Sequence, residues 1–283
     1  MKYWIIAVLV VVLAVVAWYL YDAGTPTVEE TVVPAPTLPL EEREPPPEFT
    51  RPEVTEPAIA EPMPEPEPLP EAPALPELGE SDEDVLQTLS TLVGDAAPVS
   101  AYVVDEEVIS RAVATIDALD GKQVPDSIKA VRGPGGDFQA TADEQPETVI
   151  TNDLGDPIPQ YRLDPANYAR YSPYVEMLEA MDPAEVAQAY RSYQPLLEKA
   201  FDQLGYPDAD FGQRLRDVID DLLATPEPQG PIQLIKPEAY YLYADESLES
   251  LSAGQKVLLR MGPDNASRVK AKLAAIRDAL PNS

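Results

Sequence analysis

Cysteine and histidine are both missing from the 283-residue sequence. Without cysteine the chain has no disulfide, no thiolate nucleophile and no zinc–thiolate site. Without histidine it has no Ser-His-Asp triad, no His-x-x-Glu-His metal site and no imidazole base. These absences exclude whole classes of hydrolase and metalloenzyme, and they leave only carboxylate, Lys, Tyr or Ser/Thr chemistry.

Basic residues are also scarce, because 20 Lys and Arg stand against 50 Asp and Glu, a formal net charge of −30. Nucleic acid and anionic lipid headgroups repel a chain of this charge. We therefore expect no nucleic-acid partner. No motif for a cofactor or a metal emerges, so none of either is expected.

Proline is abundant instead, with 33 residues that crowd into the first third of the chain. Residues 22–79 have a proline at every third or fourth position, interspersed with glutamates. Proline fixes φ and removes a hydrogen-bond donor, which favours extended polyproline II. We interpret 22–79 as a disordered acidic linker that acts as a spacer. The alternative is a ligand for an SH3-like groove through Pro-x-x-Pro segments.

An unbroken run of 19 uncharged, mostly apolar residues precedes this linker, from Tyr3 to Tyr21. As a helix it would be roughly 28 Å long, close to the hydrocarbon thickness of a bilayer. Aromatic residues at both ends suit the two interfaces, and Trp18-Tyr19-Leu20-Tyr21 is a poor cleavage site. We therefore favour a retained transmembrane helix at 3–21 over a cleaved signal peptide. The helix lacks a small-xxx-small face for assembly.

The charges that flank this helix give it a direction. Lys2 lies on one side, and the other side is acidic, with no Lys or Arg until Arg43. The positive-inside rule then leaves residues 1–2 as a cytoplasmic tip and places the rest outside. In a bacterium, this predicts an inner-membrane protein with a periplasmic domain.

Helical periodicity begins after Gly79 and predicts a mainly α-helical soluble domain over residues 80–283, with at most a small β-hairpin. Residues 139–160 are acidic and rich in turn signals, so we expect a flexible loop, flanked by a hairpin through Phe138 and Tyr161. Capping residues and apolar spacing place helices at 81–94, 105–119, from Asp164-Pro165 onward, 182–205 with a kink at Pro195, 211–225, 252–262 and 264–280.

Several runs in this domain are distinctive in combination: Asp164 to Tyr171, Leu204 to Asp208, Phe211 with Arg214-Leu215 and Val218 to Asp220, Ala224 to Pro228, Leu251 to Lys256, and Leu259 to Pro263. Together they resemble the bacterial domain of unknown function family 3014, over most of 78–281. The resemblance implies a Gram-negative, membrane-anchored protein. It implies no activity and transfers no functional residue. The loop at 139–160 is longer than the family pattern, which suggests a surface insertion.

Tyrosines supply the candidate binding surface. Stacked tyrosines near an arginine suit sugar rings or a proline-rich peptide, whereas tyrosines at helical spacing usually pack in a core. The turn 205–208 and the segment 224–231 are a second candidate, either as a rigid groove or as a plain helix connection. The residues of the tyrosine surface are Tyr168, Arg170, Tyr171, Tyr174, Tyr240, Tyr241 and Tyr243.

Two catalytic patterns also need weighing. Ser252 and Lys256 invite a Ser-Lys interpretation, but the spacing is wrong for Ser-x-x-Lys, and Ser252 is better explained as a helix cap. Asp217 with Asp220 or Asp221 is a candidate carboxylate pair, although a chain with 50 acidic residues contains many chance pairs. We assign no catalytic residue.

The last 30 residues reverse the charge balance, and they suit either an acidic partner or a solvated helix face. From all these features we expect a non-enzymatic envelope protein whose helical domain binds a protein partner or the cell wall. The alternative is a cell-wall hydrolase or transglycosylase with an Asp/Glu acid–base residue. The basic residues concerned are Lys256, Arg260, Arg268, Lys270, Lys272 and Arg277.

Overall fold

The computed structural model of the protein describes residues 75–146, 148–206 and 209–281. The predicted anchor at 3–21 and nearly all of the predicted linker at 22–79 lie outside these residues. Within the described ranges, no helix is both long enough and apolar enough to cross a membrane. The described residues belong to one compact unit of the chain, and the fold below is that of this unit.

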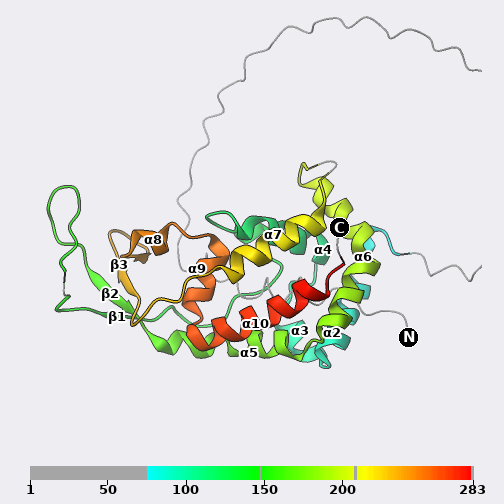
Figure 1. Ribbon diagram of the computed structural model, residues 1–283, viewed down its shortest axis with the longest axis horizontal. Coiled ribbons are helices and arrows are strands. Elements are labelled where there is room, and N and C mark those ends of the chain that lie inside the picture. The colour runs from blue at the N-terminus through cyan, green and yellow to red at the C-terminus, as the bar shows by residue number, and fades with distance from the viewer. Residues whose placement is uncertain (1–74, 147, 207–208, 282–283) are drawn as a thin grey trace, which may run out of the picture. The chain divides into compact units, whose positions relative to one another are not determined.

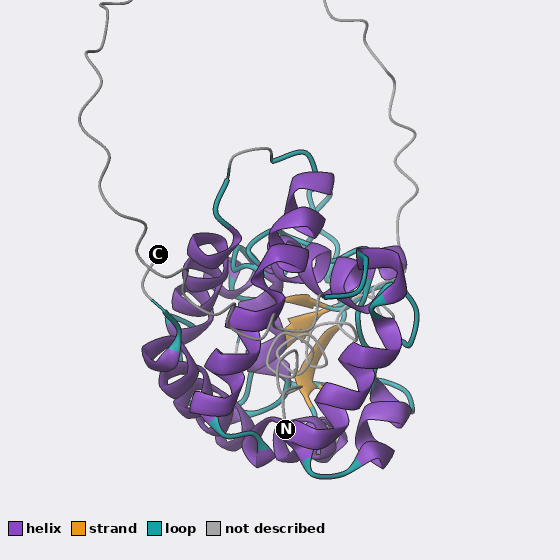
Figure 2. Cartoon of the chain, turned by 90° about the vertical axis from the view of Figure 1, so that its right-hand side faces the viewer, coloured by secondary structure: helices purple, strands orange, loops and turns teal. Residues whose placement is uncertain are grey.

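Helices dominate the unit, as the periodicity predicts, and a small sheet lies at one end of them (Figure 1). In Figure 2 the strands are seen behind the helices. Three 3-10 turns join the helices, namely η1 (Leu78–Glu80), η2 (Asp126–Ile128) and η3 (Pro165–Asn167). The helices are α2 (Asp82–Val93), α3 (Ala96–Tyr102), α4 (Val108–Leu119), α5 (Tyr168–Ala180), α6 (Pro183–Gln203), α7 (Phe211–Leu223), α8 (Glu246–Glu249), α9 (Ala253–Arg260) and α10 (Pro263–Ala279).

Most helix ends lie where their capping residues predict them. Gly94 ends α2 in the left-handed conformation, with φ of 78°. Asp182 accepts hydrogen bonds from the backbone N–H groups of Ala184 and Glu185 at the start of α6. Ser252 and Gln255 form a complete capping box at the start of α9. Each device satisfies backbone groups that a helix terminus leaves without intrahelical partners.

Two helix starts differ from the prediction. The Ser81 hydroxyl donates to the carbonyl of Leu78 and does not cap α2. Helix α4 begins at Val108 rather than at Asp105, because a side chain of α2 accepts hydrogen bonds from the N–H groups at its start. The Asp82 carboxylate accepts from the N–H groups of Glu107 (2.9 Å) and Val108 (2.8 Å).

The centre of the helical part is α9, whose eight residues are all buried. It packs against α4, α7 and α10. The approach is close at Gly254, where an added Cβ would lie 2.5 Å from the Leu222 Cδ2 atom. A helix that is buried all round differs from the usual amphipathic helix, which exposes a polar face.

The strands form one antiparallel sheet in the order β1-β2-β3-β4, namely β1 (Ala140–Ala142), β2 (Gln160–Leu163), β3 (Gln233–Ile235) and β4 (Leu242–Tyr243). The hairpin predicted between Phe138 and Tyr161 is therefore part of a larger sheet, which corrects the predicted maximum of one hairpin. Strands of two to four residues show too little alternation to be recognised in the sequence.

The register gives this sheet one buried face and one open face. Tyr161 lies opposite Ala142 on one side and Leu234 on the other, and Leu234 pairs with Tyr243. Leu234 and Tyr243 are buried. Arg162 lies opposite Thr141 and Gln233, and all three are exposed. Because successive side chains alternate between faces, Arg162 and Gln233 belong to the open face.

Candidate functional site

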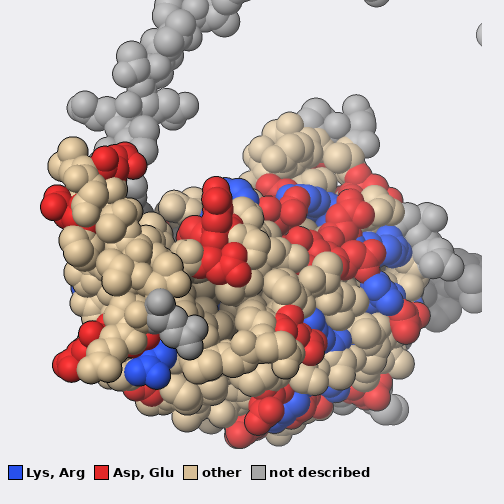
Figure 3. Space-filling view, turned by 60° about the vertical axis from the view of Figure 1, so that its left-hand side comes forward, with Lys and Arg blue, Asp and Glu red and all other residues tan. Residues whose placement is uncertain are grey.

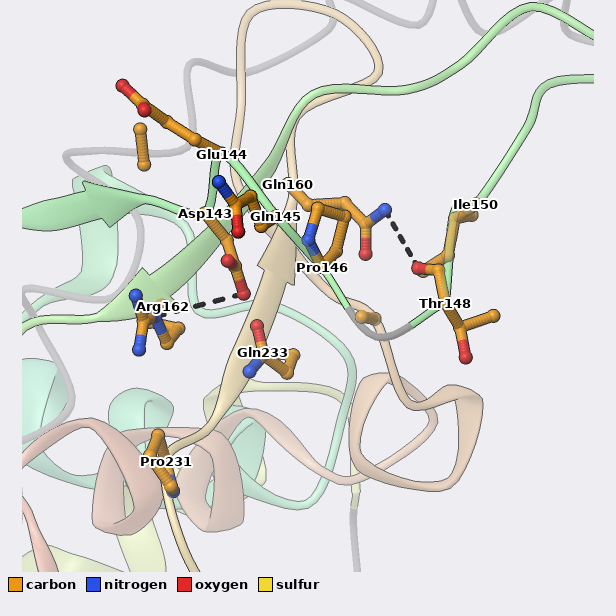
Figure 4. Close-up of a pocket in the computed structure, with 12 residues that line it drawn as sticks. Asp143, Glu144, Gln145, Pro146, Thr148, Ile150, Gln160, Arg162, Pro231 and Gln233 are labelled. Atoms are coloured by element: carbon orange, nitrogen blue, oxygen red, sulfur yellow. Dashed lines mark hydrogen bonds and ion pairs between the residues drawn. The ribbon is translucent and has the colours of Figure 1, made fainter.

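A hollow of about 810 Å³ lies on the open face of the sheet and is the candidate site (Figure 4). The sheet supplies one wall, and the segment that leaves β1 supplies the other. Side-chain amides and charged groups make up half of the lining residues. The lining residues are Ala142, Asp143, Glu144, Gln145, Pro146, Thr148, Ile150, Gln160, Arg162, Pro231, Gln233 and Ala244.

Two contacts hold the walls of the hollow together. The Arg162 Nε atom lies 3.8 Å from the Asp143 carboxylate, and both contribute to the lining. The Gln160 amide donates to the Thr148 carbonyl over 3.0 Å. Figure 4 shows both contacts crossing from β2 to the segment beyond β1. The position of this segment over the sheet is therefore fixed by side chains of the hollow itself.

The chemistry of the hollow suits a polar chain rather than a small apolar ligand. Small-molecule sites are mostly lined by apolar and aromatic side chains. Here Gln145, Gln160 and Gln233 line the wall, and no aromatic residue is among the described lining residues. A glutamine amide both donates and accepts hydrogen bonds, as does each peptide unit of an extended chain. The hollow is therefore equipped to bind main-chain groups.

The segment beyond β1 continues into a projecting hairpin, which we call the arm and which the structure describes over residues 143–146 and 148–159 (Figure 1). Thr151 and Pro157 form an isolated bridge near its tip. The Asn152 Oδ1 atom accepts from the N–H groups of Leu154 and Asp156, each over 2.9 Å. The loop predicted at 139–160 thus includes β1 and a hydrogen-bonded turn, because backbone groups pair where the sequence shows only acidic and turn residues.

The arm carries the most exposed apolar side chains of the described residues. Leu154 at the turn is 86% exposed, and Val149 is 58% exposed. Figure 3 turns this end of the protein forward and shows its surface mainly uncharged or acidic, with few basic groups. These two side chains are accessible for contact with another molecule.

The structure does not gather the seven residues of the predicted tyrosine surface on one exposed face. Tyr171, Tyr174 and Tyr243 are each at most 2% exposed, so their rings pack in the core. Burial raises the pKa of the Tyr171 and Tyr174 hydroxyls. The Tyr174 hydroxyl donates to the Arg132 carbonyl over 3.0 Å. These three tyrosines therefore agree with the alternative interpretation, packing in the core.

The other members of that surface are less buried, yet they also have structural contacts. Tyr168 lies against Gly262, where an added Cβ would be 2.5 Å from its ring. Tyr241 contacts Tyr161 edge-on, with ring centroids 5.1 Å apart. Tyr240 is half-buried beside it in the chain. The remaining member, Arg170, donates to the carbonyls of Pro134, Gly135 and Gly136.

In the structure, Ser252 and Lys256 each interact with a different acidic side chain. The Ser252 hydroxyl donates to the Asp221 carboxylate over 2.6 Å, and its oxygen caps α9. The Lys256 ammonium is buried and pairs with Glu249 at 2.5 Å. The interpretation of Ser252 as a cap is therefore confirmed, and the two side chains do not form a nucleophile–base pair.

The basic residues of the last 30 positions interact with groups of the protein itself, and four of the six pair with a carboxylate. Arg268 pairs with Glu179, and Arg277 pairs with Asp220. The Lys272 ammonium donates to the carbonyls of Glu179 (2.9 Å) and Met181 (2.7 Å) at the end of α5. Lys270 pairs with Glu227, and the Arg260 guanidinium lies between the rings of Phe138 and Tyr243, 5.3 and 5.8 Å from their centroids.

The carboxylates give little support to acid–base catalysis. Of the suggested pair, Asp217 accepts from Gln213 and Asp220 from Arg277. Burial raises the pKa of Asp221 and of Glu198. Neither of these two lines the hollow. Within the described ranges, no group of three His, Cys, Asp or Glu residues could hold a metal ion.

Sequence reasoning missed the hollow because its lining comes from three separate segments, 142–150, 160–162 and 231–244. The groove predicted from the turn 205–208 with 224–231 contributes only Pro231 to it. Pro207 and Asp208 lie outside the described residues. The available signal was that Gln160 and Arg162 are two residues apart and therefore point to the same, outward face of a strand. This signal can be recognised only once the strand is known.

Comparison with known proteins gives one match. The model of the family described as "Protein of unknown function (DUF3014)" matches residues 108–277. This range includes the hollow and the arm. No curated protein and no solved structure matches the chain.

Proposed function

The chain belongs to the DUF3014 family of proteins of unknown function, and on this premise we propose that its helical domain is a non-enzymatic docking module. The hollow with its overhanging arm is the observation that carries the proposal. The open sheet face offers amides and charges, and the arm adds exposed apolar groups. An extended segment of a partner protein is the ligand that uses both.

The hollow and the arm would contribute to binding in different ways. Main-chain hydrogen bonds to the glutamine amides would supply general affinity for an extended segment, and side-chain contacts with the arm would supply specificity. Asp143 and Glu144 in the hollow, with Asp153 and Asp156 on the arm, favour a partner segment that carries basic residues.

The predicted anchor and linker supply the setting of the proposal. A helix at 3–21 would hold the chain in the bacterial inner membrane, with the domain in the periplasm. The proline-rich linker would hold the domain away from the bilayer. The partner is then an envelope protein, and cell-wall polymer is the alternative ligand for the same polar surface.

Photo-cross-linking in intact cells tests the proposal. A benzophenone amino acid replaces Gln233 in the hollow of the full-length chain, and the matched control replaces Gln188, an exposed glutamine on α6. We expect a reproducible protein adduct of discrete mass from position 233 and none from 188. The proposal fails if position 233 gives no adduct or if both positions give the same adducts. Adducts of wall polymer alone would identify the alternative ligand.

A second variant tests the arm separately. Leu154→Asp replaces the exposed apolar group of the tip with a charge and should abolish or strongly reduce the adduct at position 233. Leu204→Asp is the matched control, because Leu204 is also exposed, at 39%, and lies at the end of α6, outside the lining of the hollow. An adduct that survives Leu154→Asp unchanged would remove the arm from the binding surface.

A further inference from the structure

A second hollow, of about 470 Å³, lies away from the sheet, beside the loop Gly133–Gly136. Val104 and Val131 contribute apolar groups to its lining. Three basic side chains, Arg111, Lys129 and Arg132, also line it, together with one carboxylate, that of Asp126. Such a grouping is unusual in a chain whose formal net charge is −30.

The backbone of the loop is oriented by Arg170. Its guanidinium donates hydrogen bonds to the carbonyls of Pro134, Gly135 and Gly136, and Arg170 does not line the hollow. The peptide bonds are trans, so each N–H points away from the carbonyl of its own peptide unit. The N–H groups of Gly135, Gly136 and Asp137 therefore face away from Arg170.

These N–H groups are available to a ligand. Among the hydrogen bonds of residues 75–146, 148–206 and 209–281, none has the N–H of Gly135 or Gly136 as donor. Gly136 has φ of +83°, the left-handed conformation found in the αR-αL pairs whose successive N–H groups point toward one concave side. Successive backbone N–H groups arranged in this way form an anion-binding nest.

Each of the three basic side chains has an acidic partner, and these partners reduce the net positive charge of the hollow. Asp126 pairs with Lys129, and Asp105 pairs with Arg132. Glu107 lies 3.8 Å from Arg111, and its side chain is 74% exposed. Burial lowers the pKa of Lys129, opposed by Asp126. An anion that enters the hollow would add a charge-assisted contact to this buried ammonium.

The formal net charge of −30 does not prevent an anion from binding in this hollow. Interactions between exposed charges are largely screened beyond about 8 Å at physiological ionic strength. An anion inside the hollow therefore interacts mainly with Arg111, Lys129 and Arg132 and with their partners Asp105, Glu107 and Asp126, and much less with distant acidic residues. We propose that this hollow binds an oxyanion, a phosphate or carboxylate group, between the basic side chains and the N–H groups of the glycine loop.

Titration calorimetry of the full-length chain in non-ionic detergent, at constant ionic strength, tests the proposal. The probes are inorganic phosphate and acetate, which distinguish the two sources of an oxyanion. We expect saturable binding of at least one of them at one site per chain. Loss of one charge-assisted contact in Lys129→Met should weaken binding by at least about tenfold.

Lys199→Met is the matched control, because it removes the same charge from an exposed ion pair with Glu77. Its affinity should stay within about twofold of wild type, since exposed pairs contribute little. Arg170→Gln keeps the three cations but releases the loop, so affinity should fall more than the melting temperature explains. No saturable binding of either ion, or equal losses in both lysine variants, would overturn the proposal. Unchanged affinity in Arg170→Gln would remove the loop from the site.

Discussion

The phenolic hydroxyl of Tyr243 donates a hydrogen bond to the main-chain carbonyl of Lys256 over 3.0 Å. Tyr243 belongs to β4 and Lys256 to the buried helix α9, and both residues are at most 3% exposed. The bond therefore joins the sheet to the centre of the helical part. A buried carbonyl that loses its donor retains the cost of desolvation.

Tyr243→Phe should lower the free energy of unfolding by about 1–2 kcal/mol, because it leaves the Lys256 carbonyl without this donor. Urea denaturation of the full-length chain measures the change. Tyr161→Phe is the control, because Tyr161 contacts Tyr241 and its hydroxyl has no hydrogen bond among the described residues. Equal losses in the two variants would show that the bond contributes nothing specific.

Asp221 makes the stability of the domain depend on pH. Burial raises its pKa above the usual 3.8, although the Ser252 hydroxyl stabilises the carboxylate. The folded state thus binds the proton more readily than the unfolded state, and stability falls as the pH rises through the raised pKa. Asp221→Asn cannot ionise and still accepts from Ser252. Its stability relative to wild type should therefore increase from about pH 3.8 upward and then level off.

Denaturant midpoints across a pH series check this expectation for Asp221. Asp217→Asn, on the same helix and with the same change of charge, is the comparison, because Asp217 is exposed. Parallel pH profiles for the two variants would contradict a specific effect of burial at Asp221.

Asn152→Ala should loosen the tip of the arm without unfolding the domain. It removes the acceptor for the N–H groups of Leu154 and Asp156. Amide hydrogen exchange should become faster at 150–158, while the global free energy of unfolding changes by less than about 1 kcal/mol. Asn152→Asp retains an acceptor oxygen and should exchange as wild type does. Unchanged exchange in Asn152→Ala would mean that the turn does not depend on this side chain.

Gly262→Ala should be among the most destabilising substitutions in the domain. Gly262 has φ of +84°, and an added Cβ would lie 2.5 Å from the Tyr168 ring. Backbone strain and overpacking together should cost on the order of 3 kcal/mol, measured as a shift in the urea midpoint. Gly79→Ala is the control, since an added Cβ there meets nothing within 4 Å. A small effect at Gly262 would show that Tyr168 moves aside easily.

Local signals predicted much of the helical fold. The caps at Asp182 and Ser252 and the stop at Gly94 each depend on residues within one helical turn, so they are visible in the sequence. The helix α3 was missed because its seven residues, which include Pro98, show no clear periodicity. Its cap, Asp95, is nevertheless a standard N-cap residue.

Long-range pairing accounts for what the sequence does not reveal. The sheet joins β2 with β3, which lie far apart in the chain, and each strand has only a few residues. The tyrosines near β4 were interpreted as a possible surface, whereas the pairing of Leu234 with Tyr243 turns that ring inward. The hollow depends on this same pairing, so its lining could not be assigned before the register was known.

The position of α9 along the chain has a consequence for biogenesis. The helix that fills the centre of the domain, Ala253–Arg260, comes after α2 to α8 along the chain. A nascent chain synthesised only as far as α8 lacks the helix that fills its apolar interior. Synthesis proceeds at about 5–20 residues per second. Completion of the core must therefore wait until residue 260 has been synthesised, and premature termination before that residue should yield a chain open to aggregation and proteolysis.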